Sequence, residues 1–345
     1  MSKLNLAFIG CGFVAQQCHL PCYSSIDFVN IHTLCDPVED LRNKLAKKYS
    51  AENQYNSHLE IDNLQEIDAF VVTLPRKLSF NVLDYLIKLK KPIFTEKPLC
   101  LDYKNAKALE ELAIKYETYI KVGYMKSNDG SIEKLKEIIN ELKKNNEVIK
   151  LINSYSFMGD SYCSPFGDSK GKFIPSIVLK EESMPYWLNK DNYYAYEQFI
   201  NVFSHISHII EYIFQEKVNL ISAKISELGE GILLCDIDKI PLSISLCRGQ
   251  QNEWDEGIDI KYGNKKVSIK FPPPFLRNVP GIIEIESGEK DNTKTVIRTN
   301  WSWAFRNQAV DFCEKVRGKY LEFDELRSAI RQIDFAEKIF REYIK

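Results

Sequence analysis

The sequence predicts an α/β protein: a doubly wound parallel sheet, then a C-terminal α/β domain with a large open, mostly antiparallel sheet. In roughly the first 125 residues, buried apolar runs alternate with helical segments, as in parallel sheets. Beyond Val218 the pattern changes to short strands separated by turn signals. We expect two domains, residues 1–124 and 125–345, because 345 residues are long for one core.

The N-terminal domain is predicted from five apolar runs, each followed by a helical pattern or a turn. The expected strands cover residues 4–10, 30–36, 67–75, 91–98 and 119–124. The expected helices start at Phe13 and cover residues 37–50, 79–90 and 105–117.

The C-terminal domain begins with a charged helix and a strand at 148–157, followed by a long irregular aromatic stretch to about Tyr196. A loop of that length in a compact domain is usually functional or poorly ordered. Turns such as YGNKK and SGEKDN indicate hairpins between the later strands, and residues 307–345 are helical by periodicity. The expected strands cover residues 219–228, 231–237, 241–249, 257–263, 265–271, 282–288 and 294–300.

Charge and composition argue against several classes of partner. The net charge is −2, from 46 basic and 48 acidic residues, so we expect neither a nucleic-acid nor a membrane partner. No apolar run approaches the roughly 20 residues of a membrane span. Nine scattered cysteines without an export signal favour reduced thiols and a cytoplasmic location. Cys11, His19 and Cys22 lie close in sequence, but no metal site is expected there.

The turn GCGFVA, residues 10–15, follows the first strand and opens a helix, as in Rossmann dinucleotide-binding domains. Gly10 makes the tight turn, Gly12 admits a pyrophosphate, and Ala15 allows close packing of helix and strand. Asp36 ends the second strand, where an acid binds the ribose hydroxyls. The alternative is a structural glycine turn and an ordinary strand-end aspartate. Asp36 repels a 2′-phosphate and the nearest arginine is Arg42, so NAD is favoured over NADP.

Lys97 lies at the end of a predicted strand, in FTEKPLC. Ligands of doubly wound sheets bind at the carboxyl ends of the strands, so Lys97 is expected to face the nicotinamide end of the site. Pro98 restricts its backbone. The alternative is a solvated lysine in a surface loop.

Two histidines share one predicted helix, residues 201–214. Val202, Ile206, Ile209 and Ile213 form an apolar stripe, while Asn201, His205, His208 and Tyr212 form a narrow polar stripe. His205 is a candidate general acid/base, because its ordinary pKa suits proton transfer near neutrality. The alternatives are an ordinary surface helix and a metal-binding histidine pair.

These motifs together resemble the Gfo/Idh/MocA oxidoreductases. The N-terminal similarity lies in GCGFVA at 10–15, CDP at 35–37, VVTLP at 71–75, EKPL at 96–99 and VGYMK at 122–126. The C-terminal half is similar in its histidine-bearing helix, in residues 254–274 and in FRNQAVDFCEKVRG at 305–318.

The resemblance implies a tightly held nicotinamide cofactor and hydride exchange with a secondary alcohol or ketone of a sugar, cyclitol or sugar nucleotide. It also implies a homodimer or homotetramer formed through the C-terminal sheet. Lys97 would orient and polarise the reacting oxygen, His205 would carry the proton, and Asn201 falls where the family usually has an aspartate. The implied cofactor-binding residues are Gly10, Gly12, Phe13, Val14, Asp36, Leu74, Pro75, Glu96 and Lys97. The implied substrate-binding residues are Lys97, Tyr124, Asn201, His205 and His208.

The chain departs from the family pattern at three places. Asn201 forms hydrogen bonds but supplies no charge. His208 stands where an aspartate often follows the catalytic histidine. Ser79 stands where many members have a histidine, after a turn that reads Pro75-Arg76-Lys77. That basic turn favours an anionic substrate such as a nucleotide sugar, or is simply exposed positive charge.

Two other functions stay open on these residues. One is a sugar-nucleotide ketoreductase or oxidase in the biosynthesis of an unusual surface sugar. The other is a dinucleotide-binding regulator without catalysis, which the Asn201 substitution keeps possible.

Overall fold

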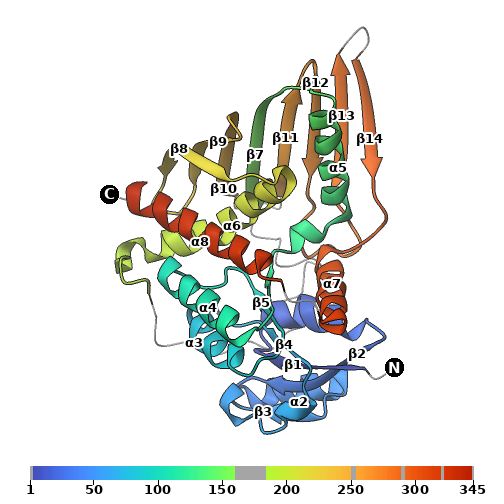
Figure 1. The fold of residues 1–345 in the computed structure, drawn as a ribbon, viewed down its shortest axis with the longest axis vertical. Helices are drawn as coiled ribbons and strands as arrows, with labels where there is room; N and C mark the ends of the chain where they lie inside the picture. Colours follow the sequence, from blue (N-terminus) through green and yellow to red (C-terminus); the bar gives the residue numbers. More distant parts are fainter. Residues whose placement is uncertain (1–2, 160–183, 250–253, 289–291, 320–321, 344–345) are drawn as a thin grey trace. The chain divides into compact units, whose positions relative to one another are not determined.

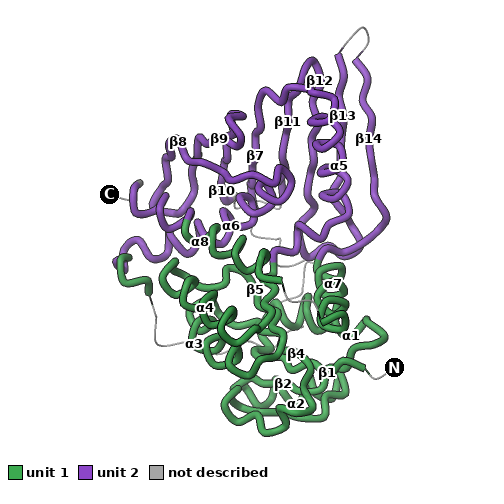
Figure 2. Tube along the Cα trace, in the orientation of Figure 1, with its two compact units in different colours: residues 1–123, 168–188, 305–334 green, residues 124–167, 189–304, 335–345 purple. Residues whose placement is uncertain are grey.

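The computed structural model describes residues 3–159, 184–249, 254–288, 292–319 and 322–343 (Figure 1). The chain divides into two compact units, coloured separately in Figure 2. Unit 1 comprises residues 1–123, 168–188 and 305–334. Unit 2 comprises residues 124–167, 189–304 and 335–345.

Unit 1 is built on a six-stranded sheet in which every neighbouring pair of strands is parallel. The strand order is β3-β2-β1-β4-β5-β6, so the direction of winding reverses between β1 and β4. The predicted doubly wound parallel sheet is therefore confirmed, and ligands of such sheets bind at the carboxyl ends of the strands beside the reversal. The strands are β1 (Leu4–Ile9), β2 (Val29–Cys35), β3 (Asn53–Tyr55), β4 (Ala69–Val72), β5 (Ile93–Glu96) and β6 (Ile120–Gly123).

Helices connect these strands, and the C-terminal helices complete the unit. The first connection is the π-helical segment η1 (Ala15–His19) followed by α1 (Leu20–Ser24). The others are α2 (Glu39–Tyr49), the short turns η2 (His58–Glu60) and η3 (Leu64–Glu66), α3 (Arg76–Ile87) and α4 (Tyr103–Tyr116). From the end of the chain come α7 (Ala304–Gly318) and the first half of α8 (Asp324–Tyr343).

Two details of unit 1 differ from the prediction. The short strand β3 was not expected, because a three-residue polar run has no apolar pattern. Helix α3 begins at Arg76 rather than Ser79, with Pro75 as its N-cap residue. The sequence Pro75-Arg76-Lys77 is therefore a helix start and not a separate turn. Basic residues are unfavourable in a first helical turn, which is why the sequence did not signal this start.

Unit 2 is built on an eight-stranded sheet with the order β14-β13-β12-β11-β7-β10-β9-β8. Neighbouring strands are antiparallel except β10 and β7, which are parallel. The predicted large, mostly antiparallel sheet is confirmed. The strands are β7 (Ile149–Gly159), β8 (Val218–Ile225), β9 (Gly231–Ile237), β10 (Ile240–Gly249), β11 (Trp254–Tyr262), β12 (Lys265–Lys270), β13 (Ile282–Gly288) and β14 (Asn292–Arg298).

Helices α5 (Gly130–Lys144) and α6 (Lys190–Phe214) pack against this sheet, α5 on β13 and α6 on β8 and β10. The short helical turn η4 (Met125–Asn128) packs against both helices. Helix α6 starts eleven residues before the predicted helix, at Lys190, after Asn189 has capped it by accepting a hydrogen bond from the Asn192 amide. Tyr196, predicted to end an irregular stretch, is therefore helical and fully buried, whereas residues 160–183 of that stretch lie outside the described residues.

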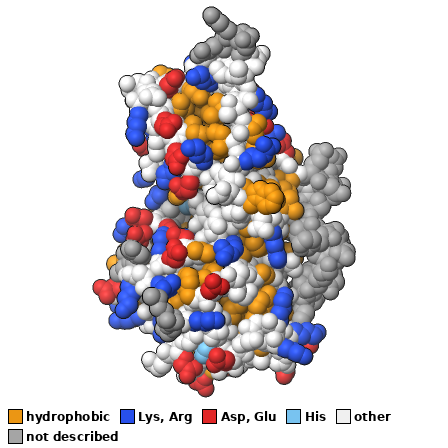
Figure 3. All heavy atoms as spheres, turned by 90° about the vertical axis from the view of Figure 1, so that its right-hand side faces the viewer, with side chains coloured by type: hydrophobic (Ala, Val, Ile, Leu, Met, Phe, Trp, Pro, Cys, Tyr) orange, Lys and Arg blue, Asp and Glu red, His pale blue; other side chains and the backbone are white. Residues whose placement is uncertain are grey.

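Acidic and basic side chains are interspersed over the face of the molecule in Figure 3. Such mixing is typical of a solvated surface without a strong field of one sign. In the part of the chain that the structure describes, no helix has both the length and the apolar character needed to cross a membrane.

Candidate active site

The glycine turn of unit 1 is held between the ends of β2 and β4. Gly10 has a φ of +88°, its amide donates to the Cys35 carbonyl at 2.8 Å, and its carbonyl accepts from the Thr73 hydroxyl at 2.6 Å. A Cβ atom at Gly10 would lie 2.7 Å from the Thr73 carbonyl oxygen. Only glycine fits both this backbone conformation and this space. The turn therefore has the close, side-chain-free approach that a bound pyrophosphate needs.

Asp36 follows β2 directly and turns its carboxylate towards the glycine turn. Its Oδ2 accepts a hydrogen bond from the Cys11 amide at 2.8 Å and its Oδ1 accepts one from the Val38 amide at 2.9 Å. The residue is 6% exposed. A carboxylate has about four acceptor positions, so two amide bonds fix its orientation and leave capacity for ribose hydroxyls. The sequence placed this acid at the strand end, and the structure adds its contact with the turn.

Arg42 and Cys11 both interact with Asp36 at this end of the sheet. The Arg42 guanidinium donates to the backbone carbonyl of Asp36, so the arginine noted only as the nearest in sequence contacts the backbone of this residue. Burial and the Asp36 charge raise the pKa of the Cys11 thiol well above its ordinary value, which keeps that thiol neutral.

The predicted lysine site lies at the end of β5. Lys97 is half-buried, follows the strand directly and is joined to Pro98 by a cis peptide bond. The Glu96 carboxylate accepts a hydrogen bond from the Lys97 amide at 3.2 Å and one from Nε2 of His19 at 2.6 Å. His19 is 1% exposed and ends the π-helical segment η1, a type of helical distortion that is frequent at functional sites.

From the sequence alone, His19 was considered only as a metal ligand, and that role was not expected. Its partner Glu96 is 77 residues away, so no local pattern reveals the contact. Gly123 on β6 leaves room for the same carboxylate, because a Cβ atom there would lie 3.2 Å from Oε1 of Glu96. Glu96, beside Lys97, is therefore bonded to His19 of η1 and lies against β6.

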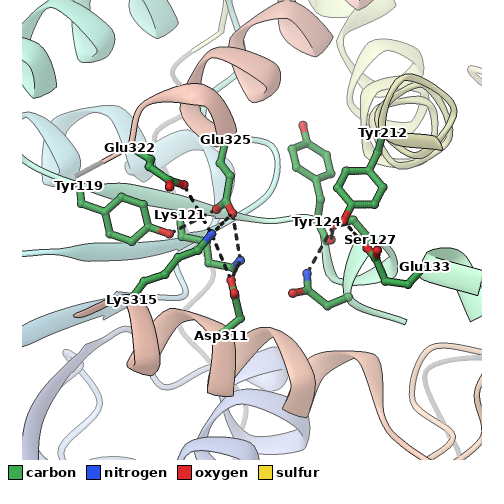
Figure 4. A network of polar contacts seen from close by, with 11 residues as sticks. Tyr119, Lys121, Tyr124, Ser127, Glu133, Tyr212, Asp311, Lys315, Glu322 and Glu325 are labelled. Atoms are coloured by element: carbon green, nitrogen blue, oxygen red, sulfur yellow. Dashed lines mark hydrogen bonds and ion pairs between the residues drawn. The ribbon is translucent and has the colours of Figure 1, made fainter. Parts of the chain in front are cut away.

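Unit 2 brings together Tyr124, His205 and His208. The His208 ring stacks on the Tyr124 ring at a centroid distance of 4.1 Å and an interplanar angle of 16°. The His205 ring lies edge-on to Tyr124, at 6.1 Å and 87°. Figure 4 shows Tyr124 with Ser127, whose hydroxyl donates to the Tyr124 carbonyl at 2.8 Å. Helical spacing places both histidines on the side of α6 that meets this tyrosine.

The predicted polar stripe of α6 is not a solvated one. His208 is only 9% exposed, and Asn201, His205 and Tyr212 are half-buried. The apolar stripe is buried as predicted. Asn201 lies one helical turn before His205, so the two side chains share a face of the helix. Within the described ranges, no group of three or more His, Cys, Asp or Glu side chains is arranged to hold a metal ion.

The glycine turn, the acid at the end of β2 and the parallel sheet are together the features of a Rossmann dinucleotide-binding domain. Residues 4–124 match the model of the GFO/IDH/MocA group, described as an oxidoreductase family with an NAD-binding Rossmann fold. The similarity to this oxidoreductase family therefore covers residues 4–124 of the 345-residue chain.

One curated relative is the myo-inositol 2-dehydrogenase of Thermotoga maritima, which is 24% identical over 136 residues. That match covers 39% of this chain and spans 40% of the length of the relative.

Solved structures share the fold over nearly the whole chain. A provisionally assigned NADPH-dependent oxidoreductase from Desulfitobacterium hafniense is 11% identical with a TM-score of 0.81, covering 100% of this chain and 96% of the other. Levoglucosan dehydrogenase in complex with NADH and levoglucosan is 12% identical with a TM-score of 0.77, covering 99% and 98%. A 3-ketoreductase from Actinomadura kijaniata, with NADP and TDP-benzene, is 12% identical with a TM-score of 0.75, covering 98% and 97%.

Proposed function

We propose that this protein transfers a hydride between NAD and a secondary alcohol or ketone of a sugar, cyclitol or sugar derivative. The observation that carries the proposal is the arrangement at the strand ends of unit 1, where the glycine turn and Asp36 lie at β1 and β2 and Lys97 lies at β5. The family match over residues 4–124 supports the same chemistry. When bound, the nicotinamide would accept or supply the hydride.

The types of residue at these strand ends suit the binding of NAD. Gly10 and Gly12 would admit the pyrophosphate, with Phe13 and Val14 following in the turn, and Asp36 would accept the ribose hydroxyls. Leu74 and Pro75, between β4 and α3, and Glu96 complete the proposed set. Asp36 opposes a 2′-phosphate, which favours NAD, although two of the structural neighbours were solved with NADP or NADH respectively.

In the oxidative direction, His205 would take the proton of the substrate hydroxyl, and the Lys97 ammonium would stabilise the negative charge that grows on that oxygen. Tyr124 and His208 would hold the His205 ring. Asn201 would hydrogen-bond the substrate or His205 without supplying charge.

A sugar-nucleotide ketoreductase is the second candidate. Arg76 and Lys77 lie in the first turn of α3, where their charges add to the positive end of the helix dipole and favour an anionic substrate group. We further propose that the protein acts as a homodimer or homotetramer formed through the sheet of unit 2.

The test begins with mass spectrometry of the cofactor that co-purifies with the protein. A panel of polyols, sugars and sugar nucleotides is then assayed by absorbance of the reduced nicotinamide. Lys97→Ala should abolish turnover while the dissociation constant for NAD stays within about tenfold, because the lysine serves the reacting carbon. Wild-type turnover in that variant would refute the role of Lys97. A tightly held cofactor with no turnover over the whole panel would instead indicate a dinucleotide-binding regulator.

A further inference from the structure

Three buried polar atoms of unit 1, where η1 and α1 meet α7, have no hydrogen-bond partner among the described residues. They are Nδ1 of His19, the hydroxyl of Tyr23 and Oε1 of Gln308. The three residues are 1%, 0% and 1% exposed respectively. Buried polar atoms are nearly always paired, so each of these atoms requires a partner that the side chains around it do not supply.

Ring contacts bring the three atoms into one small region. The Phe305 ring of α7 lies edge-on to the His19 ring, with centroids 5.7 Å apart. The Phe312 ring of the same helix lies edge-on to the Tyr23 ring, at 6.4 Å. Gln308 lies three residues after Phe305 and four before Phe312, so it shares their face of α7 and lies between the two ring contacts. The His19 and Tyr23 rings are themselves 6.3 Å apart.

Tyr23 is a neutral hydrogen-bond donor in this region. Burial raises the pKa of Tyr23 well above its ordinary value, and nearby ionisable groups raise it further, namely Cys313, Cys22, Glu96 and Tyr119. The phenol therefore keeps its hydrogen. Its hydroxyl also lies near Glu96, the carboxylate that accepts the hydrogen bond from His19.

The three atoms match the bonding capacity of one water molecule. Nε2 of His19 donates to Glu96, so Nδ1 of the neutral ring is an acceptor. Oε1 of Gln308 is a second acceptor, and the Tyr23 hydroxyl is a donor. A water molecule can donate to both acceptors and accept from the phenol, and buried waters typically form about three hydrogen bonds. Two neutral acceptors and one neutral donor favour water over an ion.

We propose that a buried water molecule bridges His19, Tyr23 and Gln308. The bridge keeps Nε2 of His19 as the donor to the Glu96 carboxylate. Glu96 also accepts a hydrogen bond from the Lys97 amide at 3.2 Å. Tyr23 and Gln308 therefore act as positioning residues for Glu96 and Lys97, and only this last step rests on the proposed function.

The ring nitrogens of His19 provide the first test. Long-range proton–nitrogen correlation spectra of the whole chain, labelled at histidine, show which nitrogen carries hydrogen, and His19→Gln identifies the signal. At pH 7 we expect hydrogen on Nε2 alone. Gln308→Glu should put hydrogen on both nitrogens, because a carboxylate at this point stabilises the charged ring. Hydrogen on Nδ1 of the wild type would overturn the proposal.

Urea denaturation distinguishes a bridged hydroxyl from an unpaired one. Tyr23→Phe should lower the midpoint, because the variant loses a hydrogen bond to the water. Removal of an unpaired buried hydroxyl would instead leave the midpoint unchanged or raise it, and that result would refute the bridge. Tyr119→Phe is the control for the nitrogen spectra, since Tyr119 is 2% exposed and stacks on Phe312. It should leave the His19 signal unchanged.

Binding of NADH tests the positioning role. Gln308→Leu should raise the dissociation constant of NADH by about threefold to tenfold, the effect of about one lost hydrogen bond, because Glu96 is held less firmly. Gln332→Leu, at another fully buried glutamine of unit 1, should leave it within about twofold. In a His19→Leu background, Gln308→Leu should add no further loss, because Gln308 acts through His19. The same loss in both backgrounds would exclude the positioning role.

These outcomes are separable from the proposed function. The nitrogen spectra and the urea midpoints are measured without turnover, so hydrogen on Nδ1 would overturn the bridge while NAD-linked turnover stood. A protein that converted no substrate would still show hydrogen on Nε2 alone.

Discussion

At the residue scale, Gly10 is a tightly constrained position of the glycine turn. Gly10→Ala places a Cβ atom 2.7 Å from a backbone oxygen, at a φ that side chains rarely adopt. We expect the free energy of unfolding to fall by about 1–3 kcal/mol, and NAD affinity to fall by about tenfold or more as the turn shifts. Chemical denaturation and calorimetry measure the two effects.

The matched control is Gly130→Ala, at the first residue of α5, where the new Cβ atom would lie 3.4 Å from its nearest neighbour. Alanine favours helix, so this variant should be as stable as the wild type or more so. If Gly10→Ala behaved like this control, the turn would not be the constrained cradle that its geometry indicates.

A substitution of Asp36 tests the preference for NAD over NADP. Asp36→Ser removes the carboxylate that repels a 2′-phosphate and leaves the Arg42 guanidinium beside the same backbone. The ratio of the NAD to the NADP dissociation constant should rise by about tenfold or more. Competition binding with both cofactors checks it, with Asp40→Asn on the surface of α2 as the control. An unchanged ratio would show that Asp36 does not face the adenosine ribose.

The sequence located strand-end residues better than it located their partners. Gly10, Asp36 and Lys97 were placed by a simple rule, because each follows directly after the end of a strand. His19 was missed because a buried histidine in a helix looks like any core residue until its distant partner is known. Arg42 was noted by distance along the chain alone, and its contact with Asp36 depends on the angle at which α2 leaves the strand.

At the scale of elements, the link between η1 and β5 is the contact of His19 with Glu96. His19→Leu fills the same space but removes the donor to a partly buried carboxylate. We expect the free energy of unfolding to fall by about 1–3 kcal/mol, because Glu96 loses its partner. His19→Gln, which offers an amide donor, should recover part of the loss. Urea denaturation of both variants measures this.

The control for the two His19 variants is His58→Leu, at a half-buried histidine of η2 in the same unit. It should change stability by less than about 0.5 kcal/mol, as is usual for positions away from a buried polar contact. Equal losses for His19→Leu, His19→Gln and His58→Leu would show that the bond to Glu96 contributes nothing specific.

Hydrophobic periodicity predicted whether a segment is a helix or a strand, but it did not predict several of the residues at which helices begin. It identified the long helices and the buried strands of both sheets. The start of α6 was missed because its first turns are rich in tyrosine and follow prolines, a pattern that also fits a loop. The parallel pairing of β10 with β7 was not predicted, because pairing partners far apart in the chain leave no local signal.

At the scale of the whole molecule, unit 1 includes chain from both ends of the sequence, held by a charged network. Lys121 on β6 is 4% exposed and forms ion pairs with Asp311 on α7 and Glu325 on α8 (Figure 4). Lys315 pairs with the same Glu325 at 2.6 Å. These contacts join β6 to helices about 190 to 204 residues later in the chain. Removing these carboxylates would leave the Lys121 charge buried and unpaired, which would strongly destabilise the protein. The network therefore stabilises unit 1.

The network predicts a pH dependence. Burial raises the pKa of Asp311, but the charges of and hydrogen bonds from Lys121 and Lys315 outweigh it, so its pKa lies below the ordinary value of 3.8. A carboxyl group with a lowered folded-state pKa stabilises the protein above its unfolded pKa, and that stabilisation is lost as the pH falls below about 4. Asp311→Asn should therefore be less stable at pH 7 and lose less stability between pH 7 and pH 3.

Denaturation at several pH values checks this, with Asp40→Asn as the control. Asp40 pairs with Lys44 on the surface, and both side chains are more than 60% exposed, so that pair should contribute almost nothing. Identical pH profiles for Asp311→Asn and the wild type would contradict the role given to the network.

The proposed homo-oligomer would form through the sheet of unit 2, which has exposed apolar side chains. Ile232 and Leu234 on β9 are 55% and 50% exposed and lie on one face, with Ser243 and Ser245 of β10 opposite them. Exposed apolar side chains on an otherwise ordered sheet are typical of protein interfaces. We expect Leu234→Glu to shift the molar mass measured by light scattering from the oligomer towards the monomer. Leu59→Glu, at an even more exposed leucine of unit 1, should leave the mass unchanged. A wild-type monomer at micromolar concentration, or equal masses for the two variants, would exclude this face as the interface.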